Sequence, residues 1–272
     1  QVSEALSLLN VALQKDPQQA LAWARQGWCH WQQGRVQQAL ASYQRSLALQ
    51  PQRLQAGIVL VSLYLLEQQA DAAQQALDTA IAQLQLQHEG LPETLVQRFT
   101  AQMRALQLEI WLALDQLEQA ESWLDQRRDD IPEQEWQALV SGFARLLAGK
   151  DRHQQAEEQL RRALKAYPEA LSLAAQLAEL VQVQGRTGQA IQLLRRAIGV
   201  AEKRSMPQAG LWLQLGRACL HSATEQARQA VEKGLRLLEQ EDETAPVNLD
   251  LLQADTPLRR APLYWQFRNL QA

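Results

Sequence analysis

The stretch ALAWARQGWCHWQQGRVQQALASYQRSLALQPQR, residues 20–53, decides the fold of this chain. In its first half, Trp23, Gly27 and His30 lie three or four residues apart, so they share one face of a helix. Gly34 follows where a glycine commonly ends a helix, because glycine adopts the left-handed conformation of that position without strain. The first half therefore predicts a short helix that ends in a tight turn.

The second half predicts another helix that folds back on the first. Ala39, Tyr43 and Ser46 lie on one stripe, and Pro51 ends the helix because proline cannot continue it. Gly27 and Ala39 are small where two antiparallel helices approach most closely, whereas Tyr43 is large where space between neighbouring hairpins must be filled. Residues 20–53 therefore predict one helical hairpin.

The hairpin pattern recurs along the chain with a period of 34 residues. The longest deviation is an insertion of about a dozen residues near residues 88–94, where Gly90 and Pro92 predict a loop with longer flanking helices. The matching second-helix positions are Ala5, Leu9, Ala12 and Pro17; Ala73, Leu77 and Ala80; Ala120, Leu124 and Pro132; Ala156, Leu160, Ala163 and Pro168; Ala190, Leu194 and Ala197; and Ala227, Val231 and Gly234.

This pattern resembles the tetratricopeptide repeat, whose signature is Trp, Gly, Tyr, Ala, Phe and Pro at matching offsets over 34 residues. His30 stands where that family prefers Tyr, Ser46 where it prefers Ala, and Gly57 where it prefers Trp. The resemblance implies an all-α fold: an α-solenoid, a right-handed superhelix of antiparallel helix pairs, with about six and a half repeats. A solenoid needs no single central core, so 272 residues set no limit on it.

We expect the solenoid to cover residues 1–238 and a C-terminal tail to cover residues 239–272. The tail carries an acidic run and an aromatic segment near Tyr264, Trp265 and Phe267. These side chains could cap the last hairpin, which we favour, or dock elsewhere. The expected repeats are a half-repeat over 1–19 and whole repeats over 20–53, 54–90, 91–134, 135–170, 171–204 and 205–238.

Composition and motifs argue against a catalytic function and against nucleic-acid binding. The net charge is −3 and the pI is about 5.9, so no field for nucleic-acid binding is implied. No apolar run approaches the roughly 20 residues of a transmembrane helix, and no signal peptide is visible, which leaves the compartment open between cytoplasm and periplasm. The four histidines lack partners at metal-ligand spacing, and no phosphate loop or nucleophile motif occurs. We therefore expect no enzyme, no metal and no cofactor.

The tetratricopeptide resemblance also implies a binding groove, because the first helix of each hairpin lines the concave face in that family. The N-terminal half of this groove is apolar and aromatic, whereas the C-terminal half alternates acid and base. The candidate groove residues are Leu21, Ala24, Trp28, Trp31 and Gln32; Ile58, Ser62, Leu65 and Leu66; Glu109 and Leu112; Ser141 and Arg145; Glu179 and Gln182; and Leu213, Arg217 and Leu220.

Two interpretations of this groove stay open. Trp28 and Trp31 are either exposed anchors for a peptide or surfaces covered by a preceding hairpin. The alternating charges are either a ligand site or, as we favour, ladders between adjacent hairpins, where exposed pairs contribute about 0–1 kcal/mol. Ala24 and Trp28 stand where chaperone-tail binders of the family carry Lys and Asn, so we expect no heat-shock-chaperone clamp.

Three functions remain. We expect a protein- or peptide-binding scaffold that is a section of a larger bacterial protein, because arrays of this kind occur in bacterial envelope assembly and polysaccharide export. The alternatives are a structural spacer or self-association module, and an accessory domain of a larger enzyme. The last rests on the tail alone, where Pro262, Leu263, Tyr264 and Trp265 resemble a stretch near the end of many sulfatases.

Overall fold

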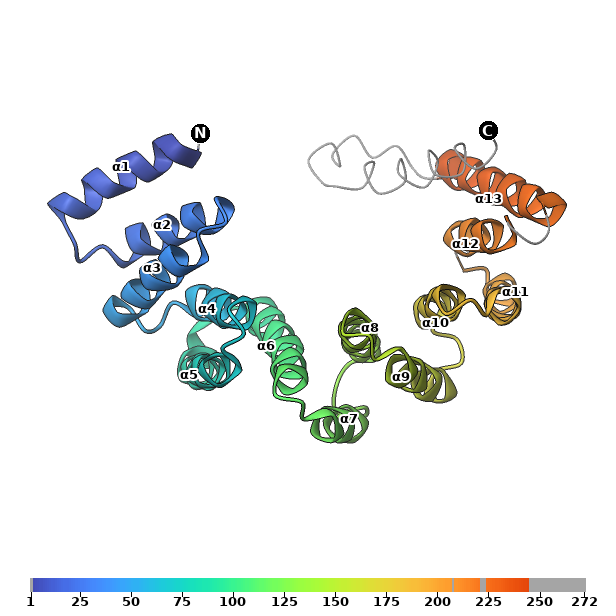
Figure 1. The fold of residues 1–272 in the computed structure, drawn as a ribbon, viewed down its shortest axis with the longest axis horizontal. Helices are drawn as coiled ribbons and strands as arrows, with labels where there is room; N and C mark the ends of the chain where they lie inside the picture. The colour runs from blue at the N-terminus through green and yellow to red at the C-terminus, as the bar shows by residue number, and fades with distance from the viewer. Residues whose placement is uncertain (1, 207, 221–223, 245–272) are drawn as a thin grey trace. The chain divides into compact units, whose positions relative to one another are not determined.

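The computed structural model describes residues 2–206, 208–220 and 224–244, and these residues form thirteen α-helices and one short 3-10 helix (Figure 1). The helices are α1 Val2–Lys15, α2 Ala20–Gln32, α3 Val36–Leu49, α4 Leu54–Leu66, α5 Ala70–Gln87, η1 His88–Gly90, α6 Glu93–Ala113, α7 Leu117–Gln126, α8 Glu133–Gly149, α9 His153–Ala166, α10 Leu171–Val183, α11 Thr187–Lys203, α12 Ala209–Cys219 and α13 Thr224–Thr244. The predicted all-α class is confirmed.

The chain divides into two compact units, Gln1–Leu146 and Leu147–Ala272, and the boundary lies inside α8. In the first unit, α2 packs against α3, and α4 packs against α5. In the second unit, α10 packs against α11, and α12 packs against α13. Each of these pairs consists of consecutive helices joined by a short turn, so the building block is the helical hairpin that the sequence predicts.

The small residues that define the repeat are the most deeply buried positions of the hairpins. Ala39, Ala73, Ala120, Ala156 and Ala190 all expose no surface. Each lies early on the second helix of its pair, where a larger side chain would hold the two backbones apart. Their burial confirms the packing that the 34-residue period predicts.

Ser46 shows why one departure from the family pattern is compatible with the core. Its side chain is fully buried, and its Oγ donates a hydrogen bond of 2.7 Å to the carbonyl of Ala20 on the partner helix. A buried hydroxyl is costly only when it lacks such a partner. The serine therefore replaces the usual alanine without leaving an orphaned polar group.

Five described hairpin turns, those between α2 and α3, α4 and α5, α6 and α7, α8 and α9, and α10 and α11, each place one residue in the left-handed region of backbone space. Gly34 and Gly185 have φ values of 71° and 78°, as glycine allows. Gln68, Asp115 and Asp151 adopt the same conformation, with φ values of 59°, 60° and 58°. The turn geometry is therefore repeated even where the sequence offers no glycine, which shows that helix packing outweighs the local preference.

The insertion predicted near residues 88–94 lies between two long helices, as expected. α5 has 18 residues and α6 has 21, and the 3-10 helix η1 connects them. Phe99 and Met103 on α6 pack into the same buried cluster as Leu77 of α5 and Val61 of α4. The additional length of α6 thus enlarges the core of the first unit.

The last described helix, α13, continues to Thr244, six residues beyond the repeat boundary expected at residue 238. The aromatic part of the expected tail lies outside the described residues. None of the helices described combines the length and the apolar character that a membrane span requires.

We predict that Gly27→Ala destabilises the protein and that Gly57→Ala does not. A Cβ at Gly27 would lie 2.8 Å from two ring carbons of Tyr43, which is buried, whereas a Cβ at Gly57 would meet only the Ala80 Cβ, at 3.4 Å. Overpacking costs typically about 1–3 kcal/mol, against about 1 kcal/mol gained when alanine replaces a helical glycine. Urea unfolding should therefore show a net loss of up to about 2 kcal/mol for the first variant and a gain of up to about 1 kcal/mol for the second. Equal effects would contradict the close approach at Gly27.

Candidate functional site

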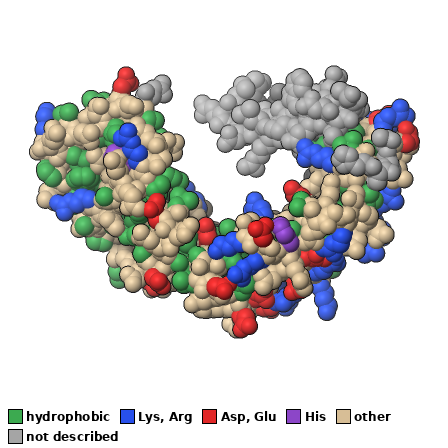
Figure 2. Space-filling view, in the orientation of Figure 1, with side chains coloured by type: hydrophobic (Ala, Val, Ile, Leu, Met, Phe, Trp, Pro, Cys, Tyr) green, Lys and Arg blue, Asp and Glu red, His purple; other side chains and the backbone are tan. Residues whose placement is uncertain are grey.

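The candidate groove residues on α2 form an exposed apolar surface. Trp28 is 48% exposed and Trp31 is 38% exposed, although both are large aromatic side chains. Leu21 on the same helix and Leu66 at the end of α4 are also exposed. We call Leu21, Trp28, Trp31 and Leu66 the apolar patch. Figure 2 shows hydrophobic surface over the first unit, interrupted by single charged side chains.

The position of α1 explains why the two tryptophans are uncovered. α1 packs on the face of α2 that carries Gln26 and Cys29, both of which are buried. Gln26 Nε2 donates a hydrogen bond of 2.7 Å to Asn10 Oδ1 of α1, and Gln26 Oε1 accepts one of 3.0 Å from Ser42 Oγ of α3. Because Trp28 and Trp31 point away from this contact, the preceding helix leaves them exposed.

The tryptophans are bordered by polar side chains and by one exposed cation, Arg25, which lies three residues before Trp28 on α2. Gln32 is exposed next to Trp31, and Ser62 on α4 is partly buried, with its Oγ donating to the carbonyl of Ile58 at 3.3 Å. Burial lowers the pKa of His30, and the positive charge of Arg35 lowers it further. His30 is therefore uncharged at neutral pH and adds no cation beside Trp31.

One predicted groove residue does not belong to this surface. Ile58 is only 6% exposed, because α6 packs across α4 and encloses it with Phe99 and Met103. Leu65 is partly buried against the same cluster and keeps some accessible surface. We therefore remove Ile58 from the candidate site, and the insertion that lengthens α6 is the physical reason.

The charged candidates lie together in pairs, one pair within each unit. Glu109 of α6 and Arg145 of α8 line a cavity of about 480 Å³. Glu179 of α10 and Arg217 of α12 line a cavity of about 360 Å³ together with Gln182 and Gln214. Each acidic candidate therefore lines the same cavity as a basic candidate: Glu109 with Arg145, and Glu179 with Arg217. A ladder of ion pairs along these residues stays a prediction.

Of the other groove candidates, Leu112 and Leu213 are buried in the core, Ser141 and Leu220 are partly buried, and Ala24 is partly buried against the cluster of α3 and α4. These positions contribute little surface for contact with a ligand. The accessible part of the predicted groove is therefore the apolar patch in the first unit and the charged pairs.

Three other tryptophans pack between helices. Trp136 is buried, and its Nε1 donates a hydrogen bond of 2.9 Å to the carbonyl of Leu124. Trp123 contacts Trp111 edge to face, with ring centroids 5.9 Å apart. These three aromatic side chains fill space between helices, so they leave Trp28 and Trp31 as the exposed pair of α2.

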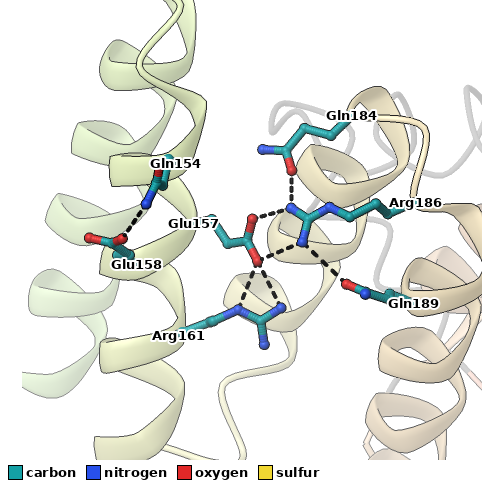
Figure 3. A network of polar contacts seen from close by, with 7 residues as sticks. All are labelled: Gln154, Glu157, Glu158, Arg161, Gln184, Arg186 and Gln189. Carbon is teal, nitrogen blue, oxygen red and sulfur yellow. Dashed lines mark hydrogen bonds and ion pairs between the residues drawn. The ribbon is translucent and has the colours of Figure 1, made fainter.

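A network of charged residues in the second unit was not predicted from the sequence (Figure 3). Glu157 on α9 accepts hydrogen bonds from Arg161, one turn along the same helix, and from Arg186 at the start of α11. Arg186 also donates to Gln184 and, at 3.3 Å, to Gln189. The network connects α9 to the turn between α10 and α11. Its signal in the sequence is weak, because Glu157 and Arg186 lie in different hairpins.

The pKa of Glu157 follows from these contacts. The hydrogen bond from Arg186 lowers the pKa of this carboxyl, burial opposes the change, and Arg161 lowers the pKa further. The same bond raises the pKa of Arg186. Glu157 is therefore ionised through the neutral range and acts as a structural anion that joins adjacent hairpins. Within the described ranges, no three His, Cys, Asp or Glu side chains are grouped so as to hold a metal ion.

These features together define a helical-repeat protein. Two family models of the tetratricopeptide repeat match the sequence, one over residues 1–53 and 142–207 and the other over residues 30–90. Together they cover more than half of the chain, and the chain belongs to the tetratricopeptide repeat family. Members of this family are generally non-catalytic, and their arrays typically mediate protein or peptide binding.

Similar solved structures belong to proteins of low sequence identity. A tetratricopeptide repeat protein from Parabacteroides merdae is 17% identical, with 98% of this chain and 92% of that chain covered and a TM-score of 0.48. The C-terminal part of a repeat-containing protein from Cytophaga hutchinsonii is 11% identical, with 93% and 95% covered and a TM-score of 0.49. PilF of Pseudomonas aeruginosa is 15% identical, with 92% and 96% covered and a TM-score of 0.42. No curated protein matches the chain.

We predict that Glu157→Gln lowers the thermal stability of the protein at neutral pH and that this difference shrinks in acid. Because the folded-state pKa of Glu157 is lowered, its contribution is fully present above the unfolded-state value of about 4.3 and is lost as the pH falls through the folded-state pKa. Melting temperatures of both proteins from pH 7 to pH 3 test this. A difference that does not change over this range would show that the charge of Glu157 is irrelevant.

Proposed function

We propose that this protein is a peptide-binding scaffold whose apolar patch anchors a partner. The observation that carries the proposal is the exposure of Trp28 and Trp31, one turn apart on a helix whose opposite face is buried. Trp is enriched among interface residues that dominate binding energy. An exposed pair on a rigid helix is pre-organised, so little conformational entropy is lost when a ligand covers it.

Burial of the two indoles supplies part of the binding free energy. Covering the exposed part of each indole removes on the order of 100 Å² of surface from water, which is worth about 2.5 kcal/mol at 25 cal/mol per Å². Two such anchors supply about 5 kcal/mol, which is comparable to the smallest estimates of the entropy lost on association, so tight binding also requires other contacts with the partner.

The chemistry of the patch indicates the kind of partner. Gln32 and Ser62 offer hydrogen bonds at its edge, and the neutral imidazole of His30 contributes no charge there. Such a surface favours a segment with two or more apolar side chains, and the exposed Arg25 beside Trp28 favours a neutral or acidic segment over a basic one. The charged pair Glu109 with Arg145, in the same unit as the apolar patch, belongs to our proposal as a secondary contact that fixes the orientation of a longer partner.

We predict that Trp28→Ala and Trp31→Ala each weaken binding of a selected peptide by about 30-fold or more, which corresponds to 2 kcal/mol at a hot spot. Peptides would be selected against the wild-type protein from a random display library and titrated by calorimetry. Leu86→Ala on α5 is the matched control, because Leu86 is also an exposed apolar side chain and lies outside the patch.

All three variants should keep the melting temperature of the wild type, since the substituted side chains are exposed. Peptides that bind both tryptophan variants with wild-type affinity would remove the patch as the binding site. A library that yields no binder to the wild type would contradict the proposed function itself.

Self-association is a second candidate function, and α1 favours it. Leu8 is 72% exposed and Val11 is 51% exposed, and they lie three residues apart on one face of this helix. A second copy of the chain could cover this face through the same residues, as in an isologous dimer.

We predict that the wild-type protein forms dimers at concentrations of about 100 μM and that the double variant Leu8→Lys, Val11→Lys is monomeric, because two lysines on an apolar contact face cost several kcal/mol of desolvation. Size-exclusion chromatography with light scattering measures both. A wild type that is monomeric over the whole concentration range would exclude this candidate.

A further inference from the structure

A cavity of about 310 Å³ lies beside Gly57, between α3, the start of α4 and α5. Its wall is mostly apolar and includes Pro51, Leu54, Leu60, Ala76 and Ala80. The cavity shares no lining residue with the apolar patch. It is therefore a separate site, and what it accommodates must be inferred from its own geometry.

The preceding hairpin shows what normally fills this position. Trp23 lies 34 residues before Gly57, on α2, and its indole Nε1 donates a hydrogen bond of 2.9 Å to the carbonyl of Pro17. Pro17 lies 34 residues before Pro51, which lines the cavity. Because α2 and α4 begin at residues 20 and 54, both pairs of residues are equivalent in the repeat.

The last hairpin, in the second unit, gives an independent example. Trp212 occupies the equivalent position on α12, and its Nε1 donates to Gln208 Oε1 at 3.2 Å. The ammonium group of Lys233 covers its ring at 4.4 Å from the centroid. In this protein the position thus accepts an indole whose N–H finds an oxygen acceptor near the start of the helix.

Glycine at position 57 is not required by the backbone. A Cβ there would make ordinary contact with Ala80 at 3.4 Å, in contrast to the tight positions Gly27 and Gly216, where a Cβ would lie 2.8 Å from a side chain. A helical glycine is also less favourable than alanine because it loses more backbone entropy on folding. The effect of Gly57 is therefore to leave the place of an indole empty.

Two polar groups at the cavity have unused hydrogen-bonding capacity. Nε of Arg53 is buried and has no hydrogen-bond acceptor among the described residues, while its Nη1 donates to Gln50 Oε1 at 3.3 Å. In the part of the chain that the structure describes, no recorded hydrogen bond ends on the carbonyl of Pro51. The site thus offers one acceptor and one charged donor around an apolar space.

We propose that this cavity binds the tryptophan side chain of a partner peptide. The indole takes the place that Trp23 takes in the preceding hairpin, and its N–H donates to the carbonyl of Pro51. Nε of Arg53 donates to a main-chain carbonyl of the same peptide. A free indole molecule has no comparable acceptor and would leave Arg53 unmatched, so the occupant is a tryptophan within a peptide.

The test uses the full 272-residue chain and the blocked tripeptide acetyl-Gly-Trp-Gly-amide, titrated by ligand-observed NMR. Three further probes are the same peptide with 1-methyltryptophan, the same peptide with phenylalanine, and free indole. The 1-methyl peptide should bind about 3- to 10-fold more weakly, because it lacks the N–H donor. Free indole should bind more weakly than the tryptophan peptide.

Two variants close the cavity and one matched variant does not. Gly57→Trp should abolish binding of the tryptophan peptide and raise the melting temperature, because the new indole fills the space. Thr79 is an exposed residue of α5 at the rim of the cavity, so Thr79→Phe places an aromatic ring there. This variant should abolish binding of the tryptophan peptide even if Gly57→Trp folds poorly. Ala82→Phe adds the same ring to an exposed position of α5 outside the cavity and should leave binding unchanged.

Arg53→Met separates the two hydrogen bonds. It should lower the affinity for the tryptophan peptide by about tenfold or more, as expected when a hydrogen bond from a charged donor is lost. The affinity for free indole should not change. Three results would overturn the proposal: no binding of the tryptophan peptide to the wild type, binding that survives in both closed variants, or equal affinity for the peptide and free indole. Loss of the apolar patch through Trp28→Ala should not alter this binding, so the two sites are tested separately.

Discussion

The close approach of two helices at a small residue is the contact on which the rest of this structure depends. Ala39 and its equivalents expose no surface, and at Gly27 even one additional carbon would meet the ring of Tyr43. A hairpin held this closely has a rigid first helix, and its outer face can carry side chains that the fold does not need. Trp28 and Trp31 lie on such a face. Rigidity in the core thus permits exposed aromatic side chains at the surface without loss of stability.

Much of the fold was predictable because the repeat makes each packing requirement appear several times. The hairpins, the buried alanines and the long helices around the insertion all followed from spacing. The turns were less predictable: Gln68 adopts the same left-handed conformation as Gly34, although no glycine stands at its position. Packing of the helix pair imposes that conformation, so local propensity is a poor guide there. The Glu157–Arg186 contact was missed for a related reason, since it joins different hairpins and no fixed spacing indicates it.

The candidate site was only partly predictable, because exposure depends on neighbours rather than on position in the repeat. Ile58 and Ala24 are equivalent by sequence, but Ile58 is enclosed by the long α6, whereas Ala24 has no such cover. Trp28 is exposed because α1 covers a different face of α2. A pattern of residues gives the face of each helix, and the lengths of the adjacent helices determine how much of that face reaches solvent.

The same reasoning explains why departures from the repeat are more informative than its regular positions. A position that obeys the pattern is explained by packing alone, as Trp23 is when its indole contacts the carbonyl of Pro17. Where the pattern is broken, either a compensating contact appears or space is left. Ser46 is compensated by its bond to the Ala20 carbonyl, whereas Gly57 is not compensated by any larger neighbour, and a cavity remains. An empty cavity next to an unpaired guanidinium nitrogen is energetically unfavourable in the free protein. A ligand that both fills the cavity at Gly57 and accepts a hydrogen bond from Nε of Arg53 therefore gains most from binding there.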